Sequence, residues 1–254
     1  MKIGIVGLGL IGGSIFKCLK NKGYDVIGVS QSQHGDGITN DYDTLKDCNM
    51  VFVCSAMNKT LEILDKLENY LKPETIVTDV CSLKEFVSNK KHKFNFIPSH
   101  PMAGTEKKGF ENSFAELFNN AKWAIIIDET SKNHEGVDIL VQLIEDMGAK
   151  AIFTSAKEHD RAVALISHMP MVISQALFLT ASDNPLAMLL ASSGFRDMTR
   201  LAMSNEEMAS DMVKMNSENI EQSILKLYKS IGELIHGNYP VTIAKIKQKR
   251  EKMF

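Results

Sequence analysis

The N-terminal stretch Lys2-Ile3-Gly4-Ile5-Val6-Gly7-Leu8-Gly9-Leu10-Ile11-Gly12 joins an apolar strand pattern to a glycine loop, and an amphipathic helical pattern follows it. In this setting the first glycine of Gly-x-Gly-x-x-Gly permits a tight turn, the second lets the backbone approach a pyrophosphate, and the third lets the helix pack closely on the sheet. The free N–H groups at the start of the helix attract phosphate. The stretch therefore predicts a dinucleotide-binding loop whose contact residues are Gly7, Gly9, Leu10, Ile11 and Gly12.

The end of the second predicted strand bears on the choice of cofactor. In loops of this type, an acidic residue about 20 positions further on holds the ribose hydroxyls of NAD. Here the strand is followed by Ser30, which can hydrogen-bond a ribose and does not repel a phosphate, and no Arg or Lys comes after it to bind the 2′-phosphate of NADP. We therefore expect NAD as the cofactor, with NADP as an alternative.

Short apolar runs alternate with helical patterns through the first part of the chain. Runs rich in β-branched and aromatic residues and bounded by Gly, Pro, Asp or Asn favour strands, whereas a period of 3.6 residues favours helices. We predict strands at Ile3–Val6, Val26–Val29, Val51–Cys54, Ile76–Val80, Phe94–Ile97 and Trp123–Ile127, and helices at Ser14–Lys20, Thr60–Leu71 and Glu135–Met147. This alternation indicates an α/β fold with a Rossmann-type, doubly wound parallel sheet.

The second part of the chain has a different pattern, because strand signals nearly vanish after Ile152 and helical periodicity continues to the C-terminus. We predict a dinucleotide-binding domain at residues 1–154 and an all-helical domain at residues 155–254. The segments Ala162–Ala181 and Ala187–Leu190 carry more apolar surface than so small a domain buries alone. We therefore expect the helical domain to form a homodimer.

The composition excludes several classes of protein. Of the 254 residues, 44% are hydrophobic and 24% are charged, which is typical of a folded globular chain and not of a disordered one. The net charge of −2 favours neither a nucleic-acid partner nor an anionic membrane. Polar residues interrupt the apolar segment Ala162–Ala181, so we expect a buried core helix there and no membrane span.

The four cysteines, Cys18, Cys48, Cys54 and Cys81, are widely spaced along the chain. They form no Cys-x-x-Cys pair and have no His-rich neighbourhood, so neither a zinc site nor a disulfide scaffold is indicated. Free thiols are typical of a reducing compartment. We therefore expect a cytoplasmic protein that holds no metal.

Two polar residues follow neighbouring predicted strands. Ser82 comes after the fourth strand, and His100 comes after the fifth in the segment Ser99-His100-Pro101-Met102. Ligands of open α/β sheets bind outside the carboxyl ends of the strands, so both residues would lie near the nicotinamide end of a bound cofactor. With a pKa of about 6.5, histidine is the usual base for removing a hydroxyl proton during hydride transfer. The alternative for His100 is a hydrogen-bonded core residue.

Two arginines stand four residues apart in the helical half, in the segment Gly194-Phe195-Arg196-Asp197-Met198-Thr199-Arg200. This spacing would place both on one face of a helix. The guanidinium fork is suited to binding a carboxylate in a bidentate manner. Alternatively, either arginine pairs with Asp197 or Glu206.

Taken together, these segments resemble the prephenate and arogenate dehydrogenases of tyrosine biosynthesis, the TyrA family, over nearly the whole chain. Besides the glycine loop, the resemblance rests on Asp79-Val80-x-Ser82-x-Lys84, His100-Pro101-Met102-Ala103-Gly104-Thr105-Glu106, His159-Asp160 with Ser167-His168-Met169-Pro170, and Gly194-Phe195-Arg196-Asp197-x-Thr199-Arg200. It implies a homodimer that converts prephenate to 4-hydroxyphenylpyruvate by NAD(P)-dependent oxidative decarboxylation. Since the glycine loop begins at residue 7, we expect no chorismate mutase module ahead of it.

The resemblance also implies roles for single residues. His100 would hydrogen-bond the ring hydroxyl of the substrate and accept its proton, while Ser82 would orient both groups. Arg200 would bind the ring carboxylate, with Arg196 nearby. The remaining positions that the resemblance places at the substrate site are Glu106, Asp160, His168 and Met171.

Two positions depart from the family pattern. Met171 stands where many prephenate-using relatives carry a histidine, and Ala209 stands where relatives often carry a tryptophan. In the family both positions lie in or near the pocket for the substrate side chain, which is a keto acid in prephenate and an amino acid in arogenate. An arogenate dehydrogenase, or a dual-specificity cyclohexadienyl dehydrogenase, is therefore the main alternative. The missing histidine also predicts weak inhibition by tyrosine.

Other classes of protein share parts of this pattern. A 3-hydroxyacid dehydrogenase or an imine reductase would have the glycine loop and a helical second domain, but would not explain the histidine and arginine motifs. A non-catalytic NAD(P)-binding regulator is an alternative outside the enzymes. The presence of Ser82, His100 and Arg200 argues against it.

Overall fold

The structure is a computed structural model that describes residues 1–105, 107–127 and 135–253. The chain divides into two compact units. The first unit comprises Met1–Val163 and Met203–Met215, and the second unit comprises Ala164–Ala202 and Asn216–Phe254. The boundary between the two domains near residue 154 stays a prediction.

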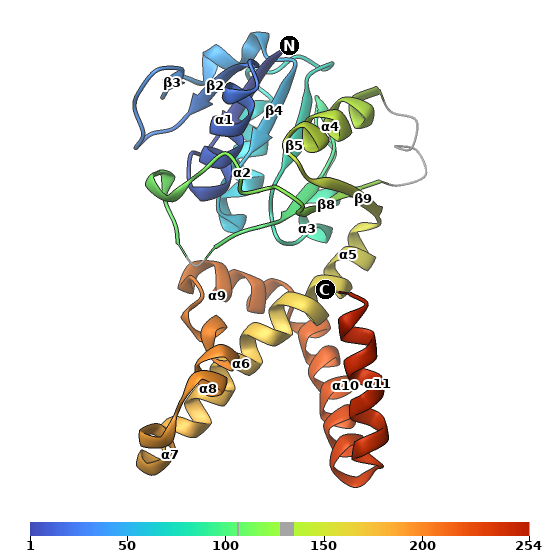
Figure 1. Ribbon diagram of the computed structural model, residues 1–254. Helices are drawn as coiled ribbons and strands as arrows, with labels where there is room; N and C mark the ends of the chain where they lie inside the picture. The colour runs from blue at the N-terminus through green and yellow to red at the C-terminus, as the bar shows by residue number, and fades with distance from the viewer. Residues whose placement is uncertain (106, 128–134, 254) are drawn as a thin grey trace. The chain divides into compact units, whose positions relative to one another are not determined.

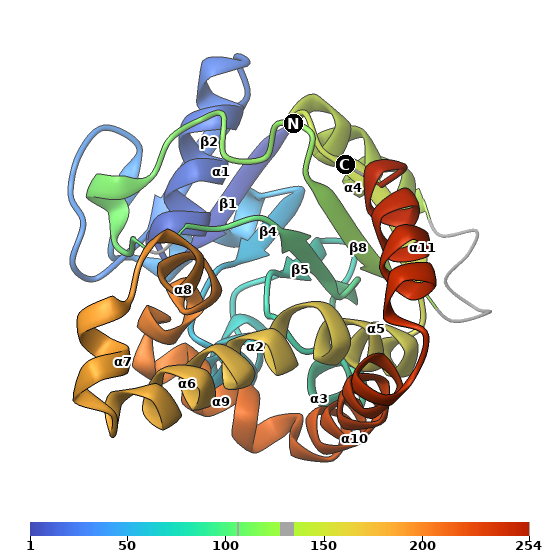
Figure 2. The same cartoon turned by 60° about the horizontal axis from the view of Figure 1, so that its bottom comes forward.

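A six-stranded parallel sheet lies at the centre of the first unit (Figures 1 and 2). Its strands are β1 (Lys2–Val6), β2 (Asp25–Val29), β3 (Ile38–Thr39), β4 (Met50–Val53), β5 (Ile76–Asp79) and β6 (Asn95–Phe96), in the order β3-β2-β1-β4-β5-β6. Every neighbouring pair is parallel. The predicted Rossmann-type sheet is therefore confirmed.

Two apolar cores cover the two faces of this sheet, because successive side chains of a strand point to opposite faces. On one face Phe52 packs in a core with side chains of α1 (Leu10–Asn21) and α4 (Glu135–Asp146). On the other face Val51 and Val53 pack with side chains of α2 (Met57–Leu67) and of the 3-10 helix η1 (Tyr42–Asp47). Helices on both faces make the sheet doubly wound. The first unit also contains α3 (Glu85–Ser88), the 3-10 helix η2 (Phe110–Asn112), α5 (Ala156–Val163) and α9 (Glu206–Met215).

A second sheet of three strands, which the sequence did not predict, lies beside the first. It consists of β7 (Ser99–Met102), β8 (Lys122–Ile126) and β9 (Lys150–Thr154), with β7 antiparallel and β9 parallel to the central β8. The strand predicted at 123–127 therefore exists, but it does not extend the parallel sheet. Pro101 weakened the strand signal of β7, and it is tolerated because β7 is an edge strand.

The described residues of the second unit form helices and turns without a strand, which confirms the predicted helical part. They are the π-helical segment Ala164–His168, α6 (Met169–Ser182), α7 (Pro185–Leu190), α8 (Ser193–Met198), the 3-10 helix η4 (Arg200–Met203, whose last residue belongs to the first unit), α10 (Ser217–His236) and α11 (Tyr239–Glu251). Helix α10 packs against both α6 and α11.

The expectation that Ala162–Ala181 is a buried core helix is wrong for the single chain. Leu177, Phe178 and Leu179 are 36%, 43% and 69% exposed, because α6 is apolar on all sides and the unit covers only part of it. By length and composition alone, the continuous helix Ala156–Ser182 could also cross a membrane, a test that core helices of soluble proteins pass as well. Exposed apolar surface on this scale marks an interaction face.

Candidate active site

The glycine loop joins β1 to α1 at the carboxyl edge of the parallel sheet. Gly7 has a φ of +91°, and a Cβ there would lie 2.6 Å from the carbonyl oxygen of Cys54. A Cβ on Gly12 would lie 2.0 Å from the carbonyl oxygen of Gly7, so the helix packs closely against the loop. Only glycine fits both positions.

The start of α1 has the features that a pyrophosphate needs. A Cβ on Gly9 would meet nothing within 4 Å, so the backbone there is open to an approaching group. Gly9 is the N-cap residue and supplies no side-chain cap, which leaves the first N–H groups of α1, beginning at Leu10 and Ile11, for a ligand. The predicted loop residues therefore form a site into which a dinucleotide phosphate fits.

Ser30 follows β2 and is 8% exposed. Its Oγ accepts hydrogen bonds from the backbone N–H groups of Ser32 at 3.3 Å and Gln33 at 3.1 Å. The hydroxyl thus shapes the turn after the strand and still has its own proton to donate. This geometry is compatible with a ribose contact at the predicted position.

A buried ion pair lies where β5 ends. The side chains of Asp79 and Lys84 are fully buried and form a hydrogen-bonded salt bridge. Asp79 Oδ2 also accepts the N–H of Cys81 at 2.9 Å, and Lys84 Nζ donates to the carbonyl oxygen of Ser99 at 2.7 Å. A buried charge is costly unless it is paired and hydrogen-bonded, and here both charges are.

Ser99 connects the two sheets immediately before His100. Its Oγ lies 2.7 Å from Thr78 Oγ1 and accepts the indole N–H of Trp123 at 2.9 Å. Its backbone N–H donates to Asp79 Oδ1 at 3.3 Å. Together with the bond from Lys84, these contacts fix the start of β7 against the end of β5.

His100 lies within a strand, which corrects the expectation that it follows one. It belongs to β7 and pairs with Ala124 of β8, because the strand predicted at 94–97 is shortened to β6 and a new strand begins at Ser99. The half-buried His100 still lies close to the end of β5 through the contacts of Ser99. His100 therefore lies near the edge of the parallel sheet, as the functional prediction expects, although it is part of a strand of the second sheet.

One hydrogen-bonding partner of His100 is a second histidine. Nδ1 of His100 lies 3.0 Å from Nε2 of His159, and the two rings meet edge to face. Nδ1 of His159 lies 2.7 Å from Oδ1 of Asp160. Sequence reasoning assigned no role to His159, although the pair His159-Asp160 belongs to a recognised motif.

Asp160, predicted at the substrate site, is 4% exposed and closes this line of side chains. Its Oδ1 accepts the N–H of Lys84 at 2.8 Å, and its Oδ2 accepts the N–H of Glu85 at 2.9 Å. These bonds join α5 to the start of α3. Asp160 therefore fixes the start of α3 through these two hydrogen bonds and also contacts His159.

Two other predicted residues are Ser82 and Glu106. Ser82 is half-buried beyond the end of β5, and among the described residues its hydroxyl makes no hydrogen bond. The observed orienting contact on His100 comes from His159. Glu106 lies outside the described residues.

The two arginines do not share one helix face, which corrects the prediction. Helix α8 contains Arg196 and ends at Met198, whereas Arg200 begins the 3-10 helix η4. Between them Thr199 leaves the helical conformation, and its hydroxyl donates to the carbonyl oxygen of Phe195 at 2.7 Å. Both arginines are exposed, and Arg196 Nε lies 4.0 Å from Asp197 Oδ1.

His168 and Met171 are buried in the second unit, with exposed fractions of 1% and 3%. His168 ends the π-helical segment, and its Nδ1 lies 3.1 Å from Asn216 Nδ2. Met171 lies in the first turn of α6. Asn216 was missed by sequence reasoning, since no motif points to it. The family-pattern position Ala209 lies in α9 of the first unit and is 8% exposed.

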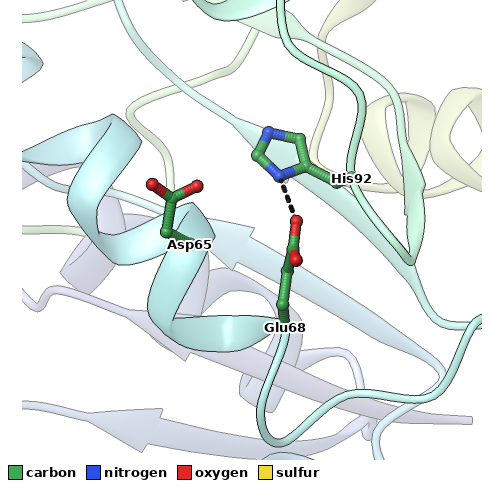
Figure 3. A group of neighbouring side chains, drawn as sticks. All are labelled: Asp65, Glu68 and His92. Carbon is green, nitrogen blue, oxygen red and sulfur yellow. Dashed lines mark hydrogen bonds and ion pairs between the residues drawn. The ribbon is translucent and has the colours of Figure 1, made fainter.

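One group of side chains has the composition of a metal site. Asp65, Glu68 and His92 each offer a ligand atom, and these atoms lie within 4.8 Å of one another (Figure 3). Nδ1 of His92 contacts Glu68 at 3.0 Å. Lys90 pairs with Asp65, and Lys93 Nζ lies 3.8 Å from Glu68. In the structure both carboxylates thus have a lysine beside them, and the group forms an ion-pair cluster.

Burial also decides the chemistry of the thiols near the glycine loop. Burial raises the pKa of Cys54 well above its usual range and that of Cys81 to about 12. Cys81 Sγ lies 2.9 Å from Thr60 Oγ1. Since the thiolate is the nucleophilic form, neither cysteine is suited to covalent catalysis.

Comparison with protein families matches both parts of the chain. The model described as "Prephenate dehydrogenase, nucleotide-binding domain" matches residues 19–153, and the model described as "Prephenate dehydrogenase, dimerization domain" matches residues 155–237. A prephenate dehydrogenase of Lactococcus lactis is 29% identical over 92% of this chain and 70% of the relative.

Solved structures agree with this match. An arogenate dehydrogenase of Synechocystis has a TM-score of 0.81 and 33% identity, and covers 99% of this chain and 94% of its own. A prephenate dehydrogenase of Aquifex aeolicus, in complex with hydroxyphenyl propionate and NAD+, has a TM-score of 0.89 and 26% identity, and covers 100% of this chain and 98% of its own.

Proposed function

Because the chain belongs to the prephenate dehydrogenase family, whose models match both of its parts, we propose that it catalyses the oxidative decarboxylation of prephenate to 4-hydroxyphenylpyruvate. One observation carries the proposal. His100 belongs to a buried hydrogen-bond network at the carboxyl edge of the parallel sheet, the same edge at which the glycine loop lies. Ligands of open α/β sheets bind at this edge.

NAD is the cofactor that we propose, held by the loop residues Gly7, Gly9, Leu10, Ile11 and Gly12. When bound, NAD+ accepts the hydride of the ring carbinol. Ser30 is the proposed donor of a hydrogen bond to a ribose hydroxyl, and the N–H groups of the following turn, which its Oγ accepts, support this role. Without an acid to exclude a 2′-phosphate, NADP remains a weaker alternative.

His100 is the proposed catalytic base, with Ser82 as a partner for the same substrate hydroxyl. The histidine accepts the proton of the ring hydroxyl as the hydride departs, and the ring carboxylate leaves as CO2. Aromatisation of the ring drives the decarboxylation, so the protein needs mainly to position the substrate and remove one proton.

The substrate carboxylate is the proposed ligand of Arg200, with Arg196 nearby. A guanidinium donates two parallel hydrogen bonds to a carboxylate, and both side chains are exposed in the chain. We place Glu106, Asp160, His168 and Met171 among the residues that shape the pocket and its charge.

Arogenate is the second candidate substrate, and Met171 is the observation that favours it. A methionine donates no strong hydrogen bond, so it does not select the keto acid of prephenate over the amino acid of arogenate. We therefore propose activity on both substrates and weak inhibition by tyrosine. The Synechocystis structure carries the name of an arogenate dehydrogenase.

A homodimer formed by the helical unit is the proposed assembly. Leu186, Leu189 and Leu190 of α7 are 61%, 80% and 71% exposed, and a second copy of this chain would cover such surface. The matching family model is described as a dimerization domain. Light scattering at micromolar concentration is expected to give twice the 28.3 kDa of one chain, and a stable monomer would contradict the assembly. The four free thiols favour a cytoplasmic location.

Turnover assays with prephenate and with arogenate, each with NAD+ and NADP+, test the function. We expect reduced cofactor to form with both substrates and faster with NAD+. Tight cofactor binding without turnover of either substrate would instead support a non-catalytic NAD(P)-binding regulator. A strong preference for NADP+ would overturn the assignment of the cofactor alone.

A further inference from the structure

His159 stands between the proposed base and a buried carboxylate. Its Nε2 lies 3.0 Å from Nδ1 of His100, and its Nδ1 lies 2.7 Å from Oδ1 of Asp160. His159 and Asp160 are each 4% exposed, so the bond between these two side chains is shielded from solvent. Three side chains from two separate segments thus form one continuous line.

The chemistry at one end sets the direction of every hydrogen bond in this line. An ionised carboxylate only accepts hydrogen bonds, and Asp160 already receives the N–H groups of Lys84 and Glu85. Nδ1 of His159 must therefore donate its proton to Asp160. A neutral imidazole has a single N–H, so Nε2 of His159 is an acceptor, and Nδ1 of His100 is the donor that it faces.

We propose that His159 is a positioning residue that, held by Asp160, fixes His100 in the tautomer with its proton on Nδ1. Nε2 of His100 is then the nitrogen that takes the substrate proton. This inference rests on the proposed function for its consequence in catalysis, but the tautomer itself is a property of the free protein.

The proton transfer balances without any further group. The O–H bond of the ring hydroxyl breaks, an N–H bond forms at Nε2 of His100, and the electron pair of the O–H bond stays on oxygen as the carbonyl forms. His100 becomes an imidazolium that donates through Nδ1 to His159, and the nearby charge of Asp160 stabilises it. No proton has to move along the line during this step.

The same network also fixes the backbone of His100. Asp160 binds the N–H of Lys84, and the side chain of Lys84 donates to the carbonyl oxygen of Ser99, the residue before His100. Asp79 pairs with Lys84 and receives the N–H of Ser99. The ring and the main chain of His100 are therefore held by a single set of buried hydrogen bonds, which is how orienting residues act on catalytic groups.

Nitrogen-15 NMR of the substrate-free protein with labelled histidines tests the tautomer directly. Comparison with His100→Ala assigns the signals of His100. At a pH where the ring is neutral, we expect a protonated Nδ1 and an unprotonated Nε2, and in His159→Leu we expect the two tautomers to become mixed. A proton on Nε2 of His100 in the parent protein would overturn the proposal.

Kinetics then measure the consequence. His159→Leu removes the acceptor and is expected to lower kcat roughly 100-fold with little change in KM, within the range of losses that orienting partners cause. His159→Gln offers an amide oxygen in its place and should recover most of the loss, which a merely structural role would not predict. His236→Gln, an exposed histidine in α10, is the matched control. A kcat for His159→Leu within threefold of the parent would also overturn the proposal.

The two readouts separate this inference from the proposed function. A protein that turns over neither prephenate nor arogenate but shows the expected tautomer would fail the proposed function only. A protein that is active but carries the His100 proton on Nε2 would fail the inference only.

Discussion

At the carboxyl edge of the first unit, the charged side chains of Asp79, Lys84 and Asp160 are almost completely buried, and each is hydrogen-bonded. In the second unit, by contrast, Leu189 and Leu190 are among the most exposed side chains of the chain. The charged groups at this edge have their hydrogen-bonding partners within the same chain. The helical unit leaves apolar surface uncovered, which a globular chain avoids unless another molecule covers it.

This difference suggests that residues of the two regions contribute to different properties of the protein. Residues of the buried edge have fixed neighbours, so they are suited to chemistry and to stability. Residues of the helical unit that face outward, such as Arg196 and Arg200, have fewer fixed neighbours and are suited to binding a partner or a ligand. Substitutions in the two regions should therefore affect different measurements.

Removal of the proposed base at the edge has the largest expected effect. His100→Ala should lower kcat by about 10²–10⁴, the usual contribution of a general base, with little change in KM because the proton is taken mainly in the transition state. Steady-state kinetics with prephenate and NAD+ measure it. A near-normal kcat would mean that the edge does not supply the base.

Breaking the buried ion pair comes next and tests stability. Lys84→Met leaves the carboxylate of Asp79 buried without its counter-charge, which costs about 3–5 kcal/mol of unfolding free energy. Urea denaturation measures the loss. Lys59→Met breaks an exposed pair with Glu62 and should leave the midpoint unchanged. Equal effects of the two substitutions would remove the distinction between the buried edge and the surface.

A substitution in the second unit should change binding and not the chemical step. Arg200→Ala removes charge-assisted hydrogen bonds to the substrate carboxylate, each worth about 1.5–3 kcal/mol, so KM should rise about 10- to 150-fold. Lys226→Ala, which removes an exposed charge from α10, is the control. A fall in kcat at constant KM would instead place Arg200 in the chemical step, and would contradict the division between the buried edge and the helical unit.

The smallest expected effect concerns substrate choice. Met171→His adds one hydrogen-bond donor, which should shift the ratio of kcat/KM values toward prephenate by about 1–2 kcal/mol and strengthen inhibition by tyrosine. The ratio for prephenate and arogenate, measured in the parent and in the variant, decides it. No change in either quantity would mean that position 171 does not contact the substrate.

Several parts of the fold were predictable because they rest on local patterns. The glycine loop was found because Gly7 and Gly12 tolerate no side chain, so the spacing itself carries the geometry. The parallel strands were found because residues such as Val51 and Phe52 are buried on opposite faces, which requires an apolar run. Such constraints act between residues close in sequence, or on every residue of a segment.

The second sheet and the helix break between the arginines were not predictable in the same way. Ser99, His100 and Pro101 have no strand pattern of their own, and they form β7 because Trp123 and Asp79 bind Ser99 from distant segments. The break at Thr199 is a change of backbone conformation, with φ of −103° and ψ of 9°, that a four-residue spacing does not register.

The sequence alone determined the dinucleotide loop, the α/β and helical parts, and the residue types needed for the proposed chemistry. Only the tertiary structure decided which of those residues meet. Fifty-nine positions separate His100 from His159, and 76 separate Lys84 from Asp160. Contacts at that separation depend on how β5, β7 and α5 pack, because the direction and partner of a buried hydrogen bond are fixed by every group around it.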